Sequence, residues 1–159
     1  MNIRQINEEY SVSGQITVDE VDEVKALGFK SIVCHRPDGE EFGQPEFAAV
    51  AKRAEELGLK IKHVPVGPMG VTPDSLAAMV DAREEFERPM LGYCRSGARS
   101  SATYEHAQRQ RGRVHRYQGV PLVVTYHPAY LLRNLPEKAK AWDDLCFAAD
   151  VFERGEAPR

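Results

Sequence analysis

Short apolar segments alternate with amphipathic helical segments between about residue 17 and residue 108. In the helical segments, apolar residues recur every three to four positions, as they do on one face of a helix. Parallel strands need a crossover segment, usually a helix, to join them, so this alternation is typical of a parallel sheet. The sequence therefore predicts an α/β fold in which a parallel sheet is flanked by helices.

Capping residues and glycines mark where these elements begin and end. The run Thr17-Val18-Asp19-Glu20 is a capping box, and Gly28 follows the helix that it starts. Thr72-Pro73 begins a later helix, and Gly58 ends the one before it. The predicted helices span about 17–27, 46–57, 72–85 and 99–108. The predicted strands span 29–34, 59–66 and 89–93.

Cys94 comes directly after the last predicted strand and opens a short loop in front of the last helix. The residues that follow it are Arg95, Ser96, Gly97, Ala98, Arg99 and Ser100. Successive backbone N–H groups in such a loop form an anion-binding nest, and the helix N-terminus adds a partial positive charge. Both lower the pKa of a thiol, and the thiolate is the form that attacks. A buried structural cysteine is the alternative, but the arginines, serines and glycine beside Cys94 favour chemistry.

Other polar residues are expected at the same edge of the sheet, because ligands of parallel sheets bind beyond the carboxyl ends of the strands. Arg36 and Asp38 follow the first predicted strand, and the loop 67–72 follows the second. Arg36 is a candidate for a second anion contact. A salt bridge with Glu40 or Glu41 is the alternative role for this arginine.

Residues 1 to about 107 resemble a phosphatase-like domain that is found alone or fused to beta-lactamase-like hydrolases, a family often labelled as sulfur transferases. The matching stretches occur in the family's order: 14–17, 28–33, 36–40, 43–45, 64–66 and 94–100. The resemblance implies a dual-specificity-phosphatase-like fold, a small anionic or phosphorylated substrate, and no cofactor or metal. It also implies that Cys94 is the nucleophile, that Arg99 clamps the oxyanion, that residues 95–98 cradle it, and that Ser100 hydrogen-bonds the thiolate.

The residues leave the reaction open. Cysteine phosphatases place five residues between the cysteine and the arginine, whereas this loop places four, as in many rhodaneses, whose cysteine carries a persulfide. A phosphatase also needs an acid that protonates the leaving oxygen. Asp74 and Asp38 are the candidates, although Asp74 also suits the first turn of a helix and Asp38 also suits a Pro-Asp-Gly turn. Phosphoryl transfer and persulfide transfer through Cys94 are therefore both hypotheses.

The overall composition argues against several other classes of protein. The 159 residues are 42% hydrophobic and carry a formal net charge of −3, which indicates no general affinity for nucleic acid. Three cysteines without paired spacing indicate a reducing compartment, and Cys34 and Cys146 are expected in the core. The chain shows no signal-peptide pattern and no apolar run of membrane-spanning length. A cytoplasmic protein without a membrane partner is therefore predicted, with no prediction of oligomeric state.

The pattern changes after residue 108. A β-hairpin is predicted at 112–117 and 120–126, followed by an amphipathic helix at 136–152. The large apolar side chains of that helix, Trp142, Leu145 and Phe152, are expected to be buried.

The stretches 111–115, 119–121, 123–134 and 140–145 resemble the carboxyl-terminal part of iron–sulfur (family 4) uracil-DNA glycosylases. The resemblance implies that His127 faces a flipped uracil and that the run Leu131-Leu132-Arg133 forms a loop that wedges the duplex. Nothing before residue 109 resembles the rest of that enzyme, so glycosylase activity is not expected. The predicted domains are a cysteine-loop domain at 1–108, a glycosylase-like fragment at 109–155 and a tail at 156–159. Weak nucleic-acid contact by the fragment, through the arginine-rich stretch 95–118 and residues 126–133, is the third hypothesis.

Overall fold

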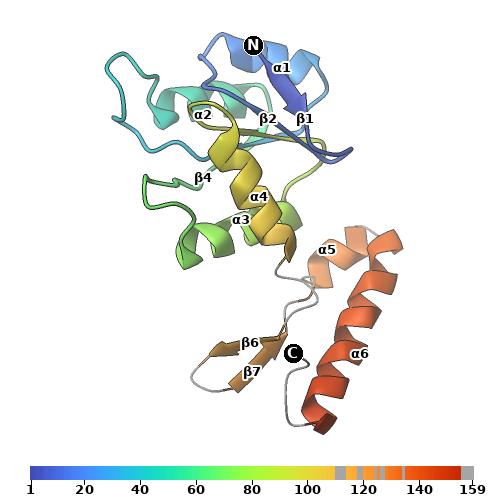
Figure 1. The fold of residues 1–159 in the computed structure, drawn as a ribbon. Helices are drawn as coiled ribbons and strands as arrows, with labels where there is room; N and C mark the ends of the chain where they lie inside the picture. Colours follow the sequence, from blue (N-terminus) through green and yellow to red (C-terminus); the bar gives the residue numbers. More distant parts are fainter. Residues whose placement is uncertain (110–113, 118–119, 124, 126–127, 134, 155–159) are drawn as a thin grey trace. The chain divides into compact units, whose positions relative to one another are not determined.

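The structure is a computed structural model, and it describes residues 1–109, 114–117, 120–123, 125, 128–133 and 135–154. The chain divides into two compact units, Met1–Glu105 and His106–Arg159. Figure 1 shows the order of the elements along the chain.

The first unit is built on a five-stranded sheet with the strand order β1-β2-β5-β3-β4. Its strands are β1 (Ile3–Gln5), β2 (Tyr10–Ser13), β3 (Ser31–Cys34), β4 (Lys60–His63) and β5 (Met90–Tyr93). All neighbouring strands pair in parallel except β1, which runs antiparallel to β2. The predicted α/β fold with a helix-flanked sheet is confirmed, and the sheet is mixed at one edge.

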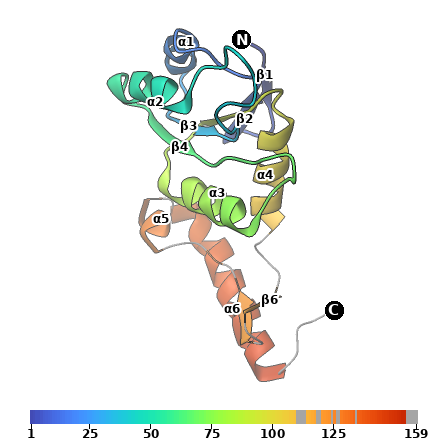
Figure 2. The ribbon, with the colours of Figure 1, turned by 90° about the vertical axis from the view of Figure 1, so that its left-hand side faces the viewer.

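Helices cover both faces of this sheet. They are α1 (Glu20–Ala26), α2 (Phe47–Glu56), α3 (Pro73–Glu85) and α4 (Ala98–Arg109). Figures 1 and 2 show α1 and α2 on one face and α3 and α4 on the other. The core beneath α1 and α2 includes Val24, Val50, Ile32 and Leu91, all fully buried. Every predicted helix and strand of this unit is present within a few residues of its expected ends.

The capping residues act as the sequence predicts. Thr17 and Glu20 exchange hydrogen bonds in front of α1, with 2.7 Å from the Thr17 nitrogen to the Glu20 carboxylate. Thr72 and Ser75 do the same at the start of α3, where the Ser75 nitrogen donates to the Thr72 hydroxyl at 3.2 Å. These bonds satisfy N–H groups that have no partner within a helix.

Strands β1 and β2 lie before residue 29, where the sequence predicts no strand, so that prediction is wrong for this part of the chain. They contain three and four residues and are too short and too polar to show a clear period of two. Their position in the sheet comes from long-range pairing: Tyr10 lies opposite Met90, and Ser13 lies opposite Tyr93. The pairing makes β5 a central strand, flanked by β2 and β3.

Gly92 allows β5 to pack against the ring of Tyr10. A Cβ atom at Gly92 would overlap the Tyr10 hydroxyl and would lie 3.2 Å from the Ser100 Cβ. The Tyr10 ring cannot move aside easily, because it is buried and stacked on Tyr104 with 4.0 Å between ring centroids. Position 92 therefore tolerates only glycine.

We expect Gly92→Ala to lower the free energy of unfolding by about 1–3 kcal/mol, the usual cost of overpacking a core. Denaturant unfolding of the full chain measures this change. Gly67→Ala is the control, because a Cβ atom there has no neighbour within 4 Å. Equal stability of the Gly92→Ala variant and the native chain would contradict this account of the packing.

The second unit contains the predicted hairpin and the predicted final helix. Strands β6 (Val114–Tyr117) and β7 (Val120–Val123) pair antiparallel, and α6 (Lys138–Arg154) follows a 3-10 turn, η1 (Leu135–Glu137). The Thr125 hydroxyl donates to the buried Asp144 carboxylate of α6 at 2.9 Å.

Three expectations for the second unit are wrong. The run Leu131-Leu132-Arg133 lies in a short helix, α5 (Pro128–Arg133), and not in a loop, because proline suits the first turn of a helix and the residues after it favour helix. On α6, the side chains expected to be buried are exposed: Trp142 by 66%, Leu145 by 55% and Phe152 by 88%. Ala141, Asp144 and Val151 face inward instead. His127 lies outside the described residues. Cys146 is exposed rather than in the core, while Cys34 is buried as expected.

No helix within the described parts of the chain combines the length and the apolar character needed to cross a membrane.

Candidate active site

Cys94 lies directly beyond the carboxyl end of the central strand. Its nitrogen donates to the Ser13 carbonyl at 3.4 Å, so the β2–β5 pairing continues into the start of the loop. On the other side, the His35 nitrogen donates to the Tyr93 carbonyl at 2.8 Å. The cysteine is thus held from both neighbouring strands at the edge where the sequence predicts a site.

The backbone of the loop is directed toward the Cys94 sulfur. The Gly97 nitrogen donates to Sγ at 3.1 Å, and Gly97 has a φ of 88°, which a residue with a Cβ rarely adopts. Burial alone would raise the pKa of the Cys94 thiol, but hydrogen bonds from the backbone N–H groups of Ser100, Ser96 and Arg99 outweigh it. The pKa of Cys94 is therefore lowered, as expected for a thiolate in an anion-binding nest at a helix N-terminus.

The Ser100 side chain also acts on this sulfur. It is fully buried, and its hydroxyl has no regular hydrogen bond within the described part of the chain. Its interaction is with Cys94, where it helps to lower the pKa of the thiol. A hydroxyl in this position can donate a hydrogen bond to a thiolate, and its O–H can rotate when the charge on the sulfur changes.

Arg99 stands at the start of α4, next to the sulfur. Its Nη1 and Nη2 atoms donate to the two carboxylate oxygens of Glu40 at 2.6 and 2.8 Å, and Nη1 also donates to the Val66 carbonyl at 2.8 Å. The Glu40 carboxylate is the main cause of the raised pKa of Arg99, and the Cys94 sulfur contributes to it as well. The predicted clamp and the predicted nucleophile are therefore neighbours.

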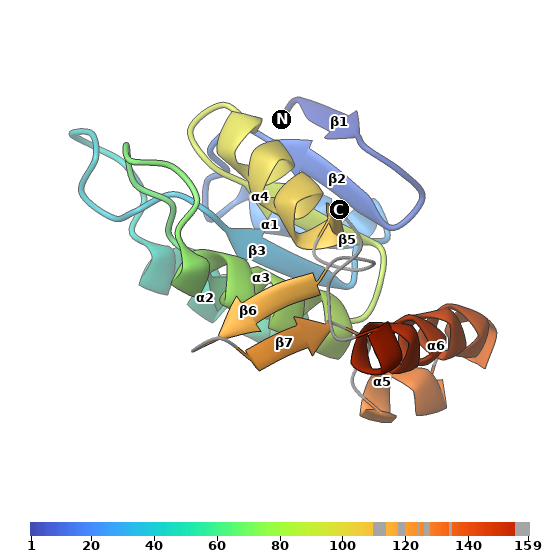
Figure 3. The same cartoon turned by 60° about the horizontal axis from the view of Figure 1, so that its bottom comes forward.

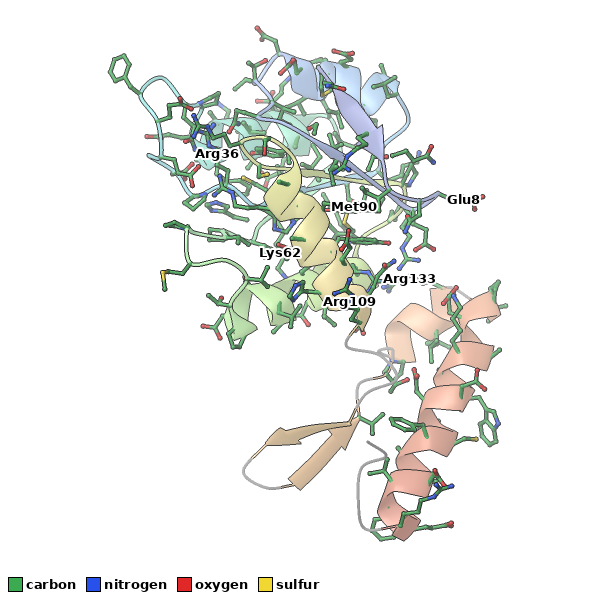
Figure 4. The ribbon with its side chains drawn as sticks, in the orientation of Figure 1. Glu8, Arg36, Lys62, Met90, Arg109 and Arg133 are labelled. Atoms are coloured by element: carbon green, nitrogen blue, oxygen red, sulfur yellow. The ribbon has the colours of Figure 1, made fainter. Side chains whose placement is uncertain are left out.

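Arg36 is engaged by protein groups. It is 3% exposed, and its guanidinium donates to Glu40 and Glu41, both at 2.9 Å, and to Gln15 at 3.0 Å. The salt-bridge alternative is thus the one that the structure shows, with both glutamates. Figure 4 shows Arg36 beside the loop that carries them, and Figure 3 shows this loop next to the loop that follows β4. Arg95 lies at the exposed rim, 3.4 Å from Glu41.

Neither predicted acid is bonded to the reacting groups. Asp38 accepts a hydrogen bond from the Phe47 nitrogen at 2.7 Å and so caps α2. Asp74 is exposed in the first turn of α3. Among the described residues, no hydrogen bond or ion pair joins either aspartate to Cys94 or Arg99. Their role as a general acid stays a prediction.

A buried polar pair lies behind the cysteine loop. His35 and Tyr10 are both buried, and the Tyr10 hydroxyl donates to the Ser100 carbonyl at 3.3 Å and lies 3.5 Å from His35 Nε2. His35 Nδ1 lies 3.1 Å from the Val64 carbonyl, which can only accept, so neutral His35 carries its proton on Nδ1. Burial lowers the pKa of His35 to about 4, so this pair is neutral and supports the start of α4.

Sequence reasoning missed the partners of Arg99. The sequence predicts Glu40 only as a partner of Arg36, and it indicates neither the Val66 carbonyl as a partner of Arg99 nor Tyr10 behind the loop. These groups are distant from residue 94 in the chain, and only strand order brings them together. The acidic pair that follows the Arg-Pro-Asp-Gly turn was the available signal. Among the described residues, no cluster of three or more His, Cys, Asp or Glu side chains is placed to hold a metal ion.

The fold and the loop together define a class of protein: a phosphatase-like domain in which a cysteine loop closes on an arginine beyond the central strand. The chain belongs to the family "Beta-lactamase hydrolase-like protein, phosphatase-like domain", which matches residues 2–110. This finding confirms the first resemblance seen in the sequence. It does not extend to residues 111–159, so the glycosylase resemblance stays a prediction.

The relatives agree with this assignment. The chain is 32% identical over 116 residues to a beta-lactamase hydrolase-like protein of Agrobacterium fabrum strain C58 and spans 27% of that protein's length. It is 35% identical over 116 residues to the protein of the same name from Xylella fastidiosa strain Temecula1, again 27% of its length. In both cases the match covers 73% of this chain. The chain thus corresponds to about a quarter of these relatives.

Two solved structures show the same fold. A candidate phosphatase of Neisseria meningitidis Z2491 is 32% identical, with a TM-score of 0.57 over 63% of this chain and 71% of that one. A candidate phosphatase of Shewanella putrefaciens CN-32 is 16% identical, with a TM-score of 0.59 over 87% of this chain and 92% of that one. The second likeness concerns the fold alone.

The lowered pKa of Cys94 can be measured from the ultraviolet absorbance of its thiolate, read as the difference between the native chain and Cys94→Ser. We expect a midpoint below that of free cysteine, about 8.5. Ser100→Ala removes one donor and should raise the midpoint by about one pH unit, since hydrogen bonds to charged groups contribute about 1.5–3 kcal/mol. Ser101→Ala, on the next residue of α4, is the control. An unchanged midpoint in Ser100→Ala would show that the hydroxyl does not act on the sulfur.

The buried His35 makes stability depend on pH. Its pKa is about 4 in the folded chain and about 6.5 when unfolded. The unfolded chain therefore binds more protons in this window, so the free energy of unfolding should fall as the pH decreases from about 6.5 to 4, by up to about 1.4 kcal/mol per pH unit. His35→Gln should flatten this slope, whereas His63→Gln, at the partly exposed histidine of β4, should retain it. Urea unfolding at each pH measures the slope, and an equal slope in the His35→Gln variant would refute the assignment.

Proposed function

We propose that this domain is a cysteine-dependent phosphatase-like hydrolase that uses the Cys94 thiolate and the Arg99 guanidinium. One observation carries the proposal: backbone N–H groups converge on a buried sulfur, lower its pKa, and place it next to an arginine. A thiolate supplies the nucleophile, and the same donors suit an oxyanion that docks against it. Membership of a phosphatase-like family supports this interpretation.

The reaction would proceed through a covalent intermediate. The Cys94 sulfur attacks phosphorus, an S–P bond forms, and the bond from phosphorus to the leaving oxygen breaks. Loop amides and Arg99 stabilise the charge on the other phosphoryl oxygens. Water then attacks phosphorus, releases inorganic phosphate and returns the thiolate. Cys94 is fully buried in the described state, so a substrate reaches the sulfur only after neighbouring side chains make room.

Protonation of the leaving oxygen is the step that the described side chains support least. Asp38 caps a helix, Asp74 is exposed, and the pKa of Glu40 is lowered to about 2, chiefly by Arg99, so Glu40 is ionised at neutral pH. Substrates whose leaving oxygen needs no proton, such as aryl phosphates, should therefore react fastest.

We expect the chain to hydrolyse an aryl phosphate, to be inhibited by vanadate, and to lose all activity in Cys94→Ser. Asp38→Asn and Asp74→Asn test the predicted acids: a general acid contributes about 10²- to 10⁴-fold, and more with poor leaving groups. We expect neither loss to reach that size with an aryl phosphate. Cys146→Ser, at the exposed cysteine of α6, is the control. Hydrolysis that survives in Cys94→Ser would refute the proposal.

Persulfide transfer is the second candidate, and the four residues between Cys94 and Arg99 favour it. A shorter ring of donors suits a smaller anion. In that case, thiosulfate treatment would add about 32 Da, one sulfur atom, to Cys94, and cyanide would release it as thiocyanate. Intact mass measurement after incubation with each donor separates the two reactions.

A DNA-associated role of residues 109–155 is the third hypothesis, and it rests on the sequence resemblance alone. Retention on duplex DNA with a steep salt dependence, unaffected by Cys94→Ser, would support it.

A further inference from the structure

We propose that Glu40 is a positioning residue for the arginine clamp. Its carboxylate binds the edge of the Arg99 guanidinium that is formed by Nη1 and Nη2. It thereby directs the other edge, formed by Nε and Nη2, toward the anion beside Cys94. The inference rests on the proposed function in that the bound anion is the reacting group.

The hydrogen bonds of Arg99 define which edge serves the ligand. A guanidinium has five N–H groups. Nη1 donates to Glu40 Oε1 at 2.6 Å and to the Val66 carbonyl at 2.8 Å, and Nη2 donates to Glu40 Oε2 at 2.8 Å. These three bonds leave the N–H of Nε and one N–H of Nη2, which are parallel and adjacent. Such a pair matches two oxygens of a phosphoryl group or a related oxyanion.

The same guanidinium interacts with the reacting sulfur, since Cys94 contributes to the raised pKa of Arg99. Arg99 is thus held between a fixed carboxylate and the thiol. Without that carboxylate, a long side chain that is 24% exposed would sample several rotamers, and the pair of N–H groups would point toward the anion only part of the time.

Glu40 is itself held in place by a second arginine. Its carboxylate therefore stays bound to Arg99 when substrate binds and does not compete with the substrate for this guanidinium. Its Oε2 also accepts from Arg36 Nε at 2.9 Å, and Arg36 is 3% exposed. Release of Glu40 would deprive two guanidiniums, one of them buried, of a charged partner. The pKa of Glu40, lowered to about 2 chiefly by Arg99, agrees with a carboxylate that stays ionised in this network.

Glu41 offers a matched control in the same loop. It accepts from Arg36 at 2.9 Å and from Arg95 at 3.4 Å, and no bond among the described residues joins it to Arg99. A general effect of charge or of loop packing would appear in Glu41→Ala as well as in Glu40→Ala.

The test makes two measurements on the full chain: tungstate affinity by calorimetry, and the rate of aryl phosphate hydrolysis. The variants are Glu40→Ala, Glu41→Ala, Arg99→Ala and the Glu40→Ala/Arg99→Ala double variant. We expect Glu40→Ala to reduce tungstate affinity and kcat by about 10- to 100-fold, the usual effect of misplacing a catalytic contact. Glu41→Ala should change both by less than about threefold, because the Glu41 side chain is 54% exposed and Arg36 keeps Glu40 as a charged partner. In the Arg99→Ala background, Glu40→Ala should have no further effect on tungstate affinity, because the two residues act as one unit.

Three results would overturn the inference. The first is tungstate binding in Glu40→Ala that equals or exceeds that of the native chain, the second is a loss on Glu40→Ala that persists without Arg99, and the third is an absence of tungstate binding in the native chain. Glu40→Gln, which keeps the shape but places an amide N–H₂ against Arg99, should behave like Glu40→Ala and guards against a folding defect. A native chain that binds tungstate in a Glu40-dependent way but hydrolyses no aryl phosphate would contradict the proposed function and still support the role of Glu40.

Discussion

The site depends on the hydrogen bonds that loop amides direct at the Cys94 sulfur. The chain provides its own comparison, because Cys34 is a second buried thiol in the same sheet. Burial raises the pKa of Cys34 to about 11, because the hydrogen bonds that its sulfur makes with the Tyr93 side chain and the Arg36 backbone do not offset the cost of burial. At Cys94 the amides of Ser96, Arg99 and Ser100 reverse the effect of burial. Depth in the fold therefore does not decide the state of a thiol; the direction of nearby N–H groups does.

The sheet holds these amides in place through contacts between distant parts of the chain. Gly92 leaves room for Tyr10, whose hydroxyl donates to the Ser100 carbonyl, and Ser13 receives the Cys94 nitrogen. The first strands of the chain thus support a loop some eighty residues later. Because the supporting pair of Tyr10 and His35 is buried and neutral, it adds no charge behind the sulfur. The loop can then stabilise a negative charge without competition from the core.

Local patterns predicted most of the first unit, and tertiary contacts account for what they missed. Capping boxes and helical periodicity located α1 to α4, and the apolar segment before Cys94 located β5, because each signal lies within a few residues. Strands β1 and β2 carry no such signal and are defined by their partners. The same difference applies to the site: the cysteine loop was evident as a motif, whereas the Glu40–Arg99 pair joins residues 59 positions apart. On α6, periodicity identified the helix but not the face that turns inward, because Asp144 is buried against Thr125 while Trp142 is exposed.

The charges around the site explain why orientation should matter more there than net charge. Arg36, Arg95 and Arg99 carry three positive charges, and Glu40 and Glu41 carry two negative ones. With the Cys94 thiolate of the proposed reaction as the third negative charge, the groups together are neutral. An anion that approaches from solvent therefore meets little net attraction at long range, and the whole chain carries a net charge of −3. At short range, fixed N–H groups in a site that excludes water interact strongly with charge. Binding should then depend on how well the oxygens of the anion match these N–H directions, which is a selection by shape. A polyanion such as DNA, bound mainly through long-range attraction to its phosphates, gains little from such a site.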